Sequence, residues 1–372
     1  MQEGLMKSKK EKILILTFIF FITCTFQWAR WSGLNNSDIG MWNIEADAVV
    51  HGGPEEFNFL GAYGHPGGPI LEGTILARAI GIPFEYDQAI IVCISVLVGL
   101  ATVAACVLCF LLRANMYWCA GVVSIVSLNW LYQFATPPST VASAFFVVLL
   151  LVVLYLYEHR ETPALQAGLL LGGSAGACIA TRTDIGVFGF SIFLIFLLLV
   201  KRLSLRGAVI AIVTTTGVFV LLDPFMWFMP LEHIGDLIYK VTYHYADIAQ
   251  AHVTITSLLH IATLSLMSIA LCIYFLFAKR KEPLPRPFVF VLLGMSVVWV
   301  SIFLTAHSQA ERYFLPILFA WEVLLPLLML SFVDQFFSTS SFKIRHTYSV
   351  GIVLVVVLYE LIFLLVDLFR FI

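Results

Sequence analysis

The longest polar interval of this chain runs from Asn35 to Pro83 and reads NNSDIGMWNIEADAVVHGGPEEFNFLGAYGHPGGPILEGTILARAIGIP. Asp38, Glu45 and Asp47 stand close together in its first half, and its second half holds the turn Gly64-His65-Pro66-Gly67-Gly68-Pro69. Long apolar runs flank the interval on both sides. Binding and catalytic residues concentrate in loops that a rigid scaffold positions, so we expect the chemistry of this protein here.

The composition indicates a membrane protein. The 372 residues are 60% hydrophobic and only 12% charged, with a mean hydropathy of +0.96, whereas a soluble domain carries about 25% charged residues. Continuous apolar runs of about 18 or more residues predict membrane-spanning helices, and the absence of alternation in them excludes a β-barrel. The net charge of −2 gives no reason to expect a nucleic-acid partner.

The apolar runs predict one all-α polytopic membrane domain over 1–372, with about 11 transmembrane helices. The first run, 13–29, follows a lysine cluster and ends in an aromatic segment, so we interpret it as an uncleaved signal anchor with a cytoplasmic N-terminus. The later runs cover 88–112, 118–134, 139–157, 165–181, 184–200, 207–222, 255–278, 287–306, 314–333 and 347–369.

The distribution of lysine and arginine agrees with this threading. Of the 21 such residues only Arg30, Arg78, Arg182, Lys240, Arg312 and Arg370 fall on the predicted outer side, which leaves 15 on the cytoplasmic side. Such a bias is typical of the segments that stay in the cytoplasm. The outer side then carries most of the acids and histidines, in the segments 30–87, 136–139, 223–254 and 307–312.

Two short helices are predicted within the first outer loop, 30–87. The segment 39–51 follows a good N-cap at Asp38 and precedes two glycines, and its apolar residues suit the membrane surface. At 100° per residue Asp38 and Glu45 share one face of this helix. A second helix is expected over 69–79, because proline fits a first helical turn. Two juxtamembrane helices joined by a rigid turn would form a platform over the bundle.

Each polar residue of this loop also has a purely structural interpretation. Asp38 can serve as a helix cap and nothing more, and His65 as a hydrogen-bonded loop histidine. Glu45 and Asp47 can be solvated residues of a polar helix face. Local sequence leaves these alternatives open.

Several short motifs, in their order and sidedness, resemble the GT-C superfamily of polyprenyl-phosphate-sugar-dependent glycosyltransferases, which includes protein O-mannosyltransferases and lipid A aminoarabinose transferases. The first loop matches in Asp38-Ile39-Gly40 and in Tyr63-Gly64-His65-Pro66-Gly67, although the family often has Asp-Glu and His-Pro-Pro there. Similar later segments are Gly172-Gly173-Ser174-Ala175-Gly176, Thr181-Arg182-Thr183-Asp184, Leu222-Asp223-Pro224 and Glu311-Arg312-Tyr313-Phe314-Leu315-Pro316. The resemblance covers most of the chain.

The resemblance implies a glycosyltransferase of the cell envelope, a multi-pass protein of the bacterial inner (cytoplasmic) membrane. It would move a sugar from a polyprenyl-phosphate donor to a glycan, lipid or protein acceptor on the extracytoplasmic face. Asp38 would act as the base, or orient the acceptor hydroxyl, with Glu45 and His65 as further catalytic candidates. No cofactor is implied apart from the lipid-linked donor itself.

The same resemblance implies a group of residues that bind the substrate and its phosphate. Arg182 and Arg312 would stabilise the phosphate charge through bidentate contacts, aided by Tyr313 and Asp223. An arginine near a helix end can instead extend to the membrane interface without chemical function, or pair with a neighbouring acid.

The outer loop 223–254 has several interpretations. His233 and Asp236, and likewise His244 and Asp247, are three residues apart, as a divalent-metal site on a helix would require. No tight multi-ligand motif accompanies them, so no metal ligand is predicted. Contact with the acceptor or with membrane lipid is favoured over a metal site, and a plain interfacial structure without chemical function is the other interpretation of this aromatic loop.

Two other classes of protein compete with the transferase. A transporter or lipid flippase would bind its substrate near the bilayer midplane and often shows inverted repeats. No internal repeat is found, and the candidate ionisable residues lie at the predicted outer interface. A non-catalytic scaffold of the same fold would lack a lipid-sized groove beside Asp38.

Overall fold

In this computed structural model the described residues are 2–32, 68–81, 86–111, 164–181, 203–239 and 342–370, with isolated helical positions between 149 and 198, 266 and 274, and 329 and 333. Over these residues every element is a helix, which confirms the predicted all-α class there. The helices are α1 (Gln2–Ser32), α4 (Gly68–Ala79), α5 (Tyr86–Leu111), α8 (Ala164–Thr181), α10 (Leu205–Leu221), α11 (Phe225–Phe228), α12 (Pro230–Tyr239) and α17 (Phe342–Arg370).

Three described helices are long and apolar enough to cross a membrane. They are the segments Lys10–Ala29, Gln88–Leu108 and Ala164–Thr181, in α1, α5 and α8. Shorter apolar helices cover Leu205–Leu221 and His346–Tyr359. These five coincide with predicted spans. The other predicted spans, and the first surface helix at 39–51, lie wholly or largely outside the described residues.

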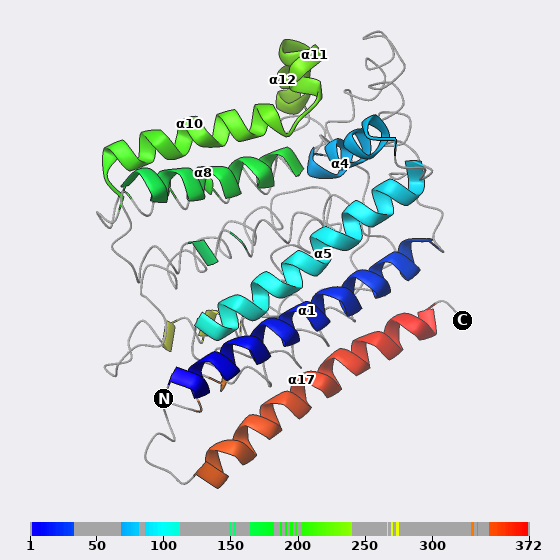
Figure 1. The fold of residues 1–372 in the computed structure, drawn as a ribbon, viewed down its shortest axis with the longest axis vertical. Helices are drawn as coiled ribbons and strands as arrows, with labels where there is room; N and C mark the ends of the chain where they lie inside the picture. The colour runs from blue at the N-terminus through cyan, green and yellow to red at the C-terminus, as the bar shows by residue number, and fades with distance from the viewer. Residues whose placement is uncertain are drawn as a thin grey trace.

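Helices α1, α8, α10 and α17 run across the molecule in one direction, and α5 runs in the opposite direction (Figure 1). The C-terminal ends of α1, α8, α10 and α17 lie at the same end of the molecule as the N-terminal end of α5 and the short helices α4, α11 and α12. The sequence-based threading placed all of these ends on one side of the membrane. We call this the α4 end of the molecule.

Helices α8 and α10 pack closely and in parallel through small residues. A Cβ added at Gly168, Gly172 or Gly176 would lie 2.8, 2.5 and 2.6 Å from the backbone oxygens of Gly207, Ala211 and Thr215 respectively. Four-residue spacing of small residues on both helices lets the two backbones approach, as in glycine-zipper contacts between membrane helices. The glycine-rich span noted in the sequence is therefore a packing face.

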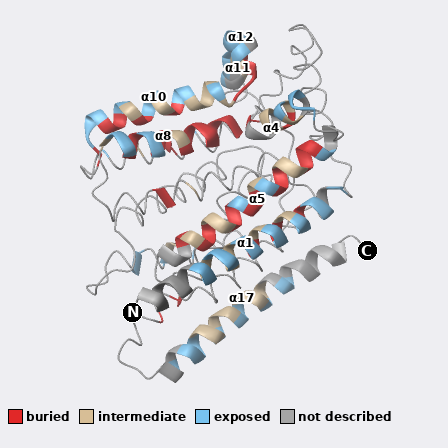
Figure 2. Ribbon diagram, in the orientation of Figure 1, coloured by how far each residue is buried: buried red, intermediate tan, exposed pale blue. Residues whose placement is uncertain are grey.

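Helices α1 and α5 form a second close pair. A Cβ on Gly99 of α5 would lie 2.6 Å from Cys24 Sγ of α1. Ile90, Ile94 and Leu108 on α5 are fully buried, whereas much of α1 is exposed (Figure 2). The exposed residues of α1 are large and apolar, which fits a lipid surround better than water.

Helix α4 confirms the predicted helix over 69–79 and joins the two pairs. Gly68, with φ +43°, sits against the C-terminal end of α8, where an added Cβ would lie 2.6 Å from Ala180 O. One turn later a Cβ on Gly73 would lie 2.6 Å from Cys93 Sγ of α5. The glycine-proline turn of the first loop therefore ends on the last residues of α8.

Candidate functional site

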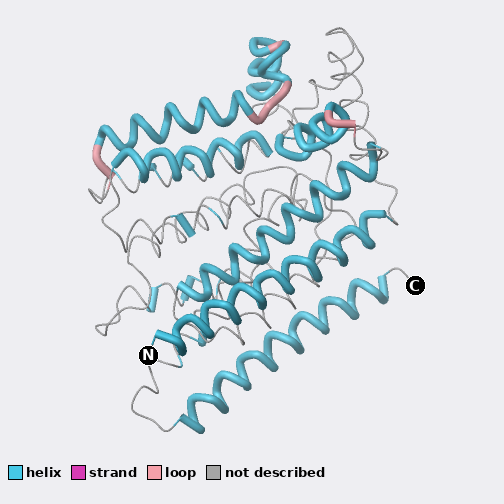
Figure 3. Tube along the Cα trace, viewed as in Figure 1, coloured by secondary structure: helices cyan, strands magenta, loops and turns pink. Residues whose placement is uncertain are grey.

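The turn between α10 and α11 places Asp223 at the α4 end, in one of the short described loops (Figure 3). Pro224 cannot continue α10 because it lacks a backbone N–H and forces the preceding residue out of the helical region. The Phe225 N–H donates to Asp223 Oδ1 at 3.1 Å, and the Met226 N–H donates to the Asp223 carbonyl at 3.0 Å. This is a side-chain-stabilised turn of the kind that aspartate favours.

Helix α12 folds back onto this turn through His233. His233 Nε2 lies 2.7 Å from Asp223 Oδ2, and the two side chains are 2% and 0% exposed. The Phe225 ring stacks on the imidazole, with ring centroids 5.2 Å apart and 30° between the planes. Two polar groups and one aromatic ring thus join α11 and α12 to the end of α10.

The protonation of Asp223 reflects two opposing effects. Burial raises the pKa of this carboxyl above its ordinary value, while the hydrogen bond with His233 and those from the backbone of Phe225 and Met226 act against the rise. The other ring nitrogen, His233 Nδ1, is buried and has no hydrogen-bond partner among the described residues. An unmet buried polar group costs about 1–3 kcal/mol, which makes Nδ1 a place where a ligand atom would be stabilising.

Glu72 brings the first outer loop into this site. It is the one acidic residue of α4 and is half-buried. Burial first, and then repulsion from the Asp223 charge, raises the pKa of Glu72 to about 7. Two carboxyls from distant parts of the sequence therefore influence each other at the α4 end. Sequence reasoning missed Glu72, and its only local signal was a carboxylate within a short apolar helix.

The end of α8 lies beside the same region. Gly68 contacts Ala180 and Thr181, and the buried Thr181 hydroxyl donates to the Ala177 carbonyl at 2.7 Å. Arg182 follows directly in the sequence, and His65 precedes Gly68 by three positions. The structure therefore places Gly68 beside Thr181, which are three positions and one position from the predicted site residues His65 and Arg182 in the sequence.

Of the predicted site residues, Asp223 is within the described part of the chain and is placed in this buried pair. Asp38, Glu45, His65, Arg182, Arg312 and Tyr313 lie outside the described residues. The spacing of His233 and Asp236 suggested a pair, but His233 bonds to Asp223 instead. Within the described ranges no group of three or more histidine, cysteine or acidic residues could hold a metal ion.

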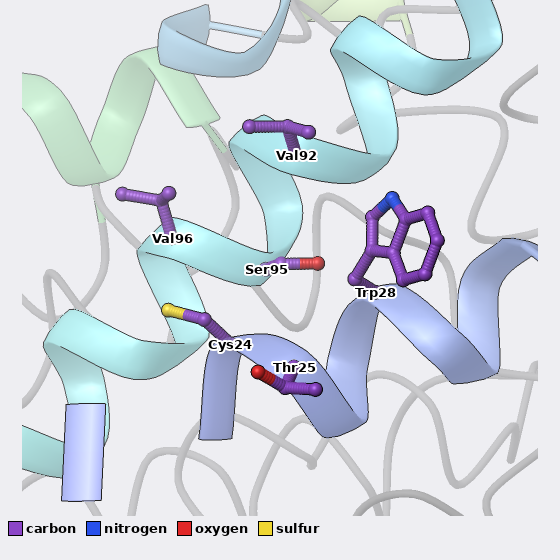
Figure 4. A pocket seen from close by; sticks show the side chains of 6 residues that line it. All are labelled: Cys24, Thr25, Trp28, Val92, Ser95 and Val96. Atoms are coloured by element: carbon purple, nitrogen blue, oxygen red, sulfur yellow. The ribbon is translucent and has the colours of Figure 1, made fainter. Parts of the chain in front are cut away.

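A shallow cavity of about 230 Å³ lies between α1 and α5 (Figure 4), away from the Asp223 site. It is lined by Cys24, Thr25, Trp28, Val92, Ser95 and Val96. The Thr25 and Ser95 hydroxyls donate to carbonyls of their own helices, at 2.8 and 2.7 Å. We attribute this cavity to imperfect packing of two apolar helices.

No protein-family model, curated protein or solved structure matches this chain. The resemblance to GT-C glycosyltransferases therefore stays a prediction from sequence motifs. The case for function rests on those motifs and on the geometry of the Asp223 site.

Proposed function

We propose that this protein is an integral-membrane glycosyltransferase that moves a sugar from a polyprenyl-phosphate donor to an acceptor on the extracytoplasmic face. One observation carries the proposal. Glu72 of the first outer loop, the Thr181 end of α8 and the buried Asp223–His233 pair gather at the α4 end. Thr181 and Asp223 belong to motifs of the resemblance, and Glu72 lies in the loop that holds two further motifs.

The proposed reaction is a nucleophilic displacement at the anomeric carbon of the sugar. The acceptor oxygen forms a bond to this carbon while the bond from the carbon to the phosphate oxygen breaks. The electron pair leaves with the polyprenyl phosphate, and the hydroxyl proton passes to Asp38 as the base. Arg182 and Arg312 would stabilise the charge that develops on the phosphate.

The described residues suit a site that holds a phosphate beside carboxyl groups. A phosphate is repelled by ionised carboxylates, so a carboxyl that keeps its proton near neutral pH lowers this cost. The pKa of about 7 at Glu72 has that effect. A protonated carboxyl also offers an O–H donor to a phosphate or sugar oxygen. We infer that Glu72 and Asp223 line the donor site.

The test is turnover and binding by the purified protein in detergent, with a panel of undecaprenyl-phosphate sugars. Wild type should bind one donor and release undecaprenyl phosphate. Asp38→Asn should bind the same donor, but its turnover should be slower by about 100-fold or more. Asp223→Asn should change donor affinity, because it removes a carboxylate from the site, whereas Asp236→Asn, which removes a carboxylate elsewhere in the same outer loop, should leave it unchanged.

Full activity in a normally expressed Asp38→Asn protein would refute Asp38 as the base. Failure of every donor to bind the folded wild type would refute the transferase and favour the transporter or scaffold alternatives. Equal donor binding by Asp223→Asn and Asp236→Asn would show that the α10–α11 turn is not part of the donor site.

A further inference from the structure

Helix α12 exposes apolar side chains that a helix on a water-facing surface would bury. It buries His233, which is 2% exposed, and exposes Leu231, Ile234 and Ile238, which are 82%, 40% and 59% exposed. A helix on a soluble protein turns its apolar stripe toward the core and its polar residues toward solvent. The exposed side of α12 therefore requires an apolar neighbour outside the described fold.

The three exposed apolar residues form one face. At 100° per residue Leu231, Ile234 and Ile238 fall within an arc of about 60°. Measured from the centre of this arc, Asp236 lies about 170° away, and Glu232 and His233 lie about 130° away on either side, so the polar residues occupy the opposite half of the helix. The hydrogen bond from His233 to Asp223 fixes this rotation of the helix about its axis. We name the Leu231, Ile234 and Ile238 side the α12 apolar face.

The α12 apolar face follows closely in the chain on α10, whose surface is also apolar and exposed. Val209, Val213 and Leu221 of α10 are 51%, 65% and 63% exposed, as expected of a helix surrounded by lipid. Between the two helices Trp227 is 46% exposed, and its Nε1–H donates to the Val220 carbonyl at 2.7 Å. Tryptophan with an apolar ring and a satisfied N–H is typical of the membrane–water interface.

We propose that α12 is an interfacial helix whose apolar face binds membrane lipid, at the boundary of the acyl chains and headgroups. Lipid is the occupant that the structure favours, because α12 follows the exposed apolar helix α10 and the half-exposed Trp227 in the chain, and because its apolar face carries no polar side chain. The carboxylates of Glu232 and Asp236 lie on the opposite half of the helix, as in a helix that lies in the membrane interface with its polar side toward water. This inference is independent of the proposed transferase activity.

The first test uses the wild-type protein in nanodiscs of phosphatidylethanolamine and phosphatidylglycerol, one copy per disc, under hydroxyl-radical footprinting. Oxidation at Leu231 and Ile238 should be several-fold slower than at the same residues after transfer to a short-chain detergent that leaves the outer face accessible. Oxidation of both residues in nanodiscs at the rate seen in the detergent would overturn the inference.

The second test measures depth directly. In a protein whose seven cysteines are replaced, Leu231→Cys and Ile238→Cys carry an environment-sensitive fluorophore, and Glu232→Cys is the matched control on the same helix. In vesicles with spin-labelled phosphatidylcholine, the label should be quenched at 231 and 238 but not at 232. Quenching that is equal at all three positions, or absent at all three, would overturn the inference, provided that each variant elutes as the wild type does.

Discussion

Asp223 Oδ2 lies 2.7 Å from His233 Nε2, with both side chains buried at the junction of α10, α11 and α12. The two residues are ten positions apart, and both α11 and α12 begin between them. A buried polar pair of this kind contributes little net stability when intact, but it becomes costly when one partner is removed. It attaches α12 to the end of the apolar helix α10.

We expect His233→Leu to lower the free energy of unfolding by about 1–3 kcal/mol, because the Asp223 carboxyl would stay buried without its partner. His233→Gln should cost less, since its amide N–H can still donate to Asp223. Thermal unfolding in detergent measures the change, and hydrogen exchange should show faster opening of α12 in His233→Leu. Asp236→Leu controls for the replacement of a polar residue of α12 by leucine, and a His233→Leu protein as stable as this control would contradict the prediction.

The α8–α10 contact predicts a sharp difference between two neighbouring glycines. A Cβ on Gly172 would lie 2.5 Å from Ala211 O, whereas a Cβ on Gly173 would have no atom within 4 Å. Gly172→Ala should therefore separate the helices and cost about 1–3 kcal/mol, as overpacking does. Gly173→Ala should be neutral or slightly stabilising, because alanine favours helix. Unfolding of the two variants side by side tests this, and equal stability would show that α8 and α10 do not pack through this face.

Apolar periodicity and turn residues were enough to predict α1, α4, α5, α8, α10 and α17, whereas α11 and α12 lie in a segment that the sequence indicated only as an outer loop. The helix over 69–79 was predicted from Pro69 and the glycines around it, and α4 begins and ends within a residue of that segment. Asp223 was selected by its place in an outer Asp-Pro step. These signals are local, and local signals survive folding when no tertiary contact opposes them.

The partners in the site could not be predicted in the same way. The spacing of His233 and Asp236 suggested a pair along one helix, but the turn at Pro224 brings α12 back toward Asp223. Glu72 gave no signal because its importance comes from a carboxyl that is distant in sequence. Such proximity depends on how helices pack, which the polarity pattern of one segment does not encode.

The contact of Gly68 with α8 predicts that Gly68→Ala displaces α4. The residue has φ +43°, and an added Cβ would meet Ala180 O at 2.6 Å. Gly81→Ala is a matched control, because Gly81 also has positive φ, at +73°, but has open space around it. Backbone strain should lower the free energy of unfolding of both variants by about 1 kcal/mol. That of Gly68→Ala should fall further because of the contact with Ala180 O. Faster hydrogen exchange in α4 of Gly68→Ala than of Gly81→Ala would identify the contact as the cause, and identical exchange would refute it.

Glu72 predicts how stability depends on pH. Its pKa is raised from the ordinary 4.5 to about 7 by burial and by the Asp223 charge, so the folded state holds this proton more tightly than the unfolded state. The resulting stabilisation is complete below pH 4.5 and is lost as the pH rises through about 7. Glu72→Gln cannot ionise, so its melting temperature should exceed that of wild type above pH 7 and should fall less between these two pH values. The exposed Glu232→Gln variant controls for the removal of one charge, and an unchanged pH profile in Glu72→Gln would show that burial and the Asp223 charge do not raise the pKa of this carboxyl.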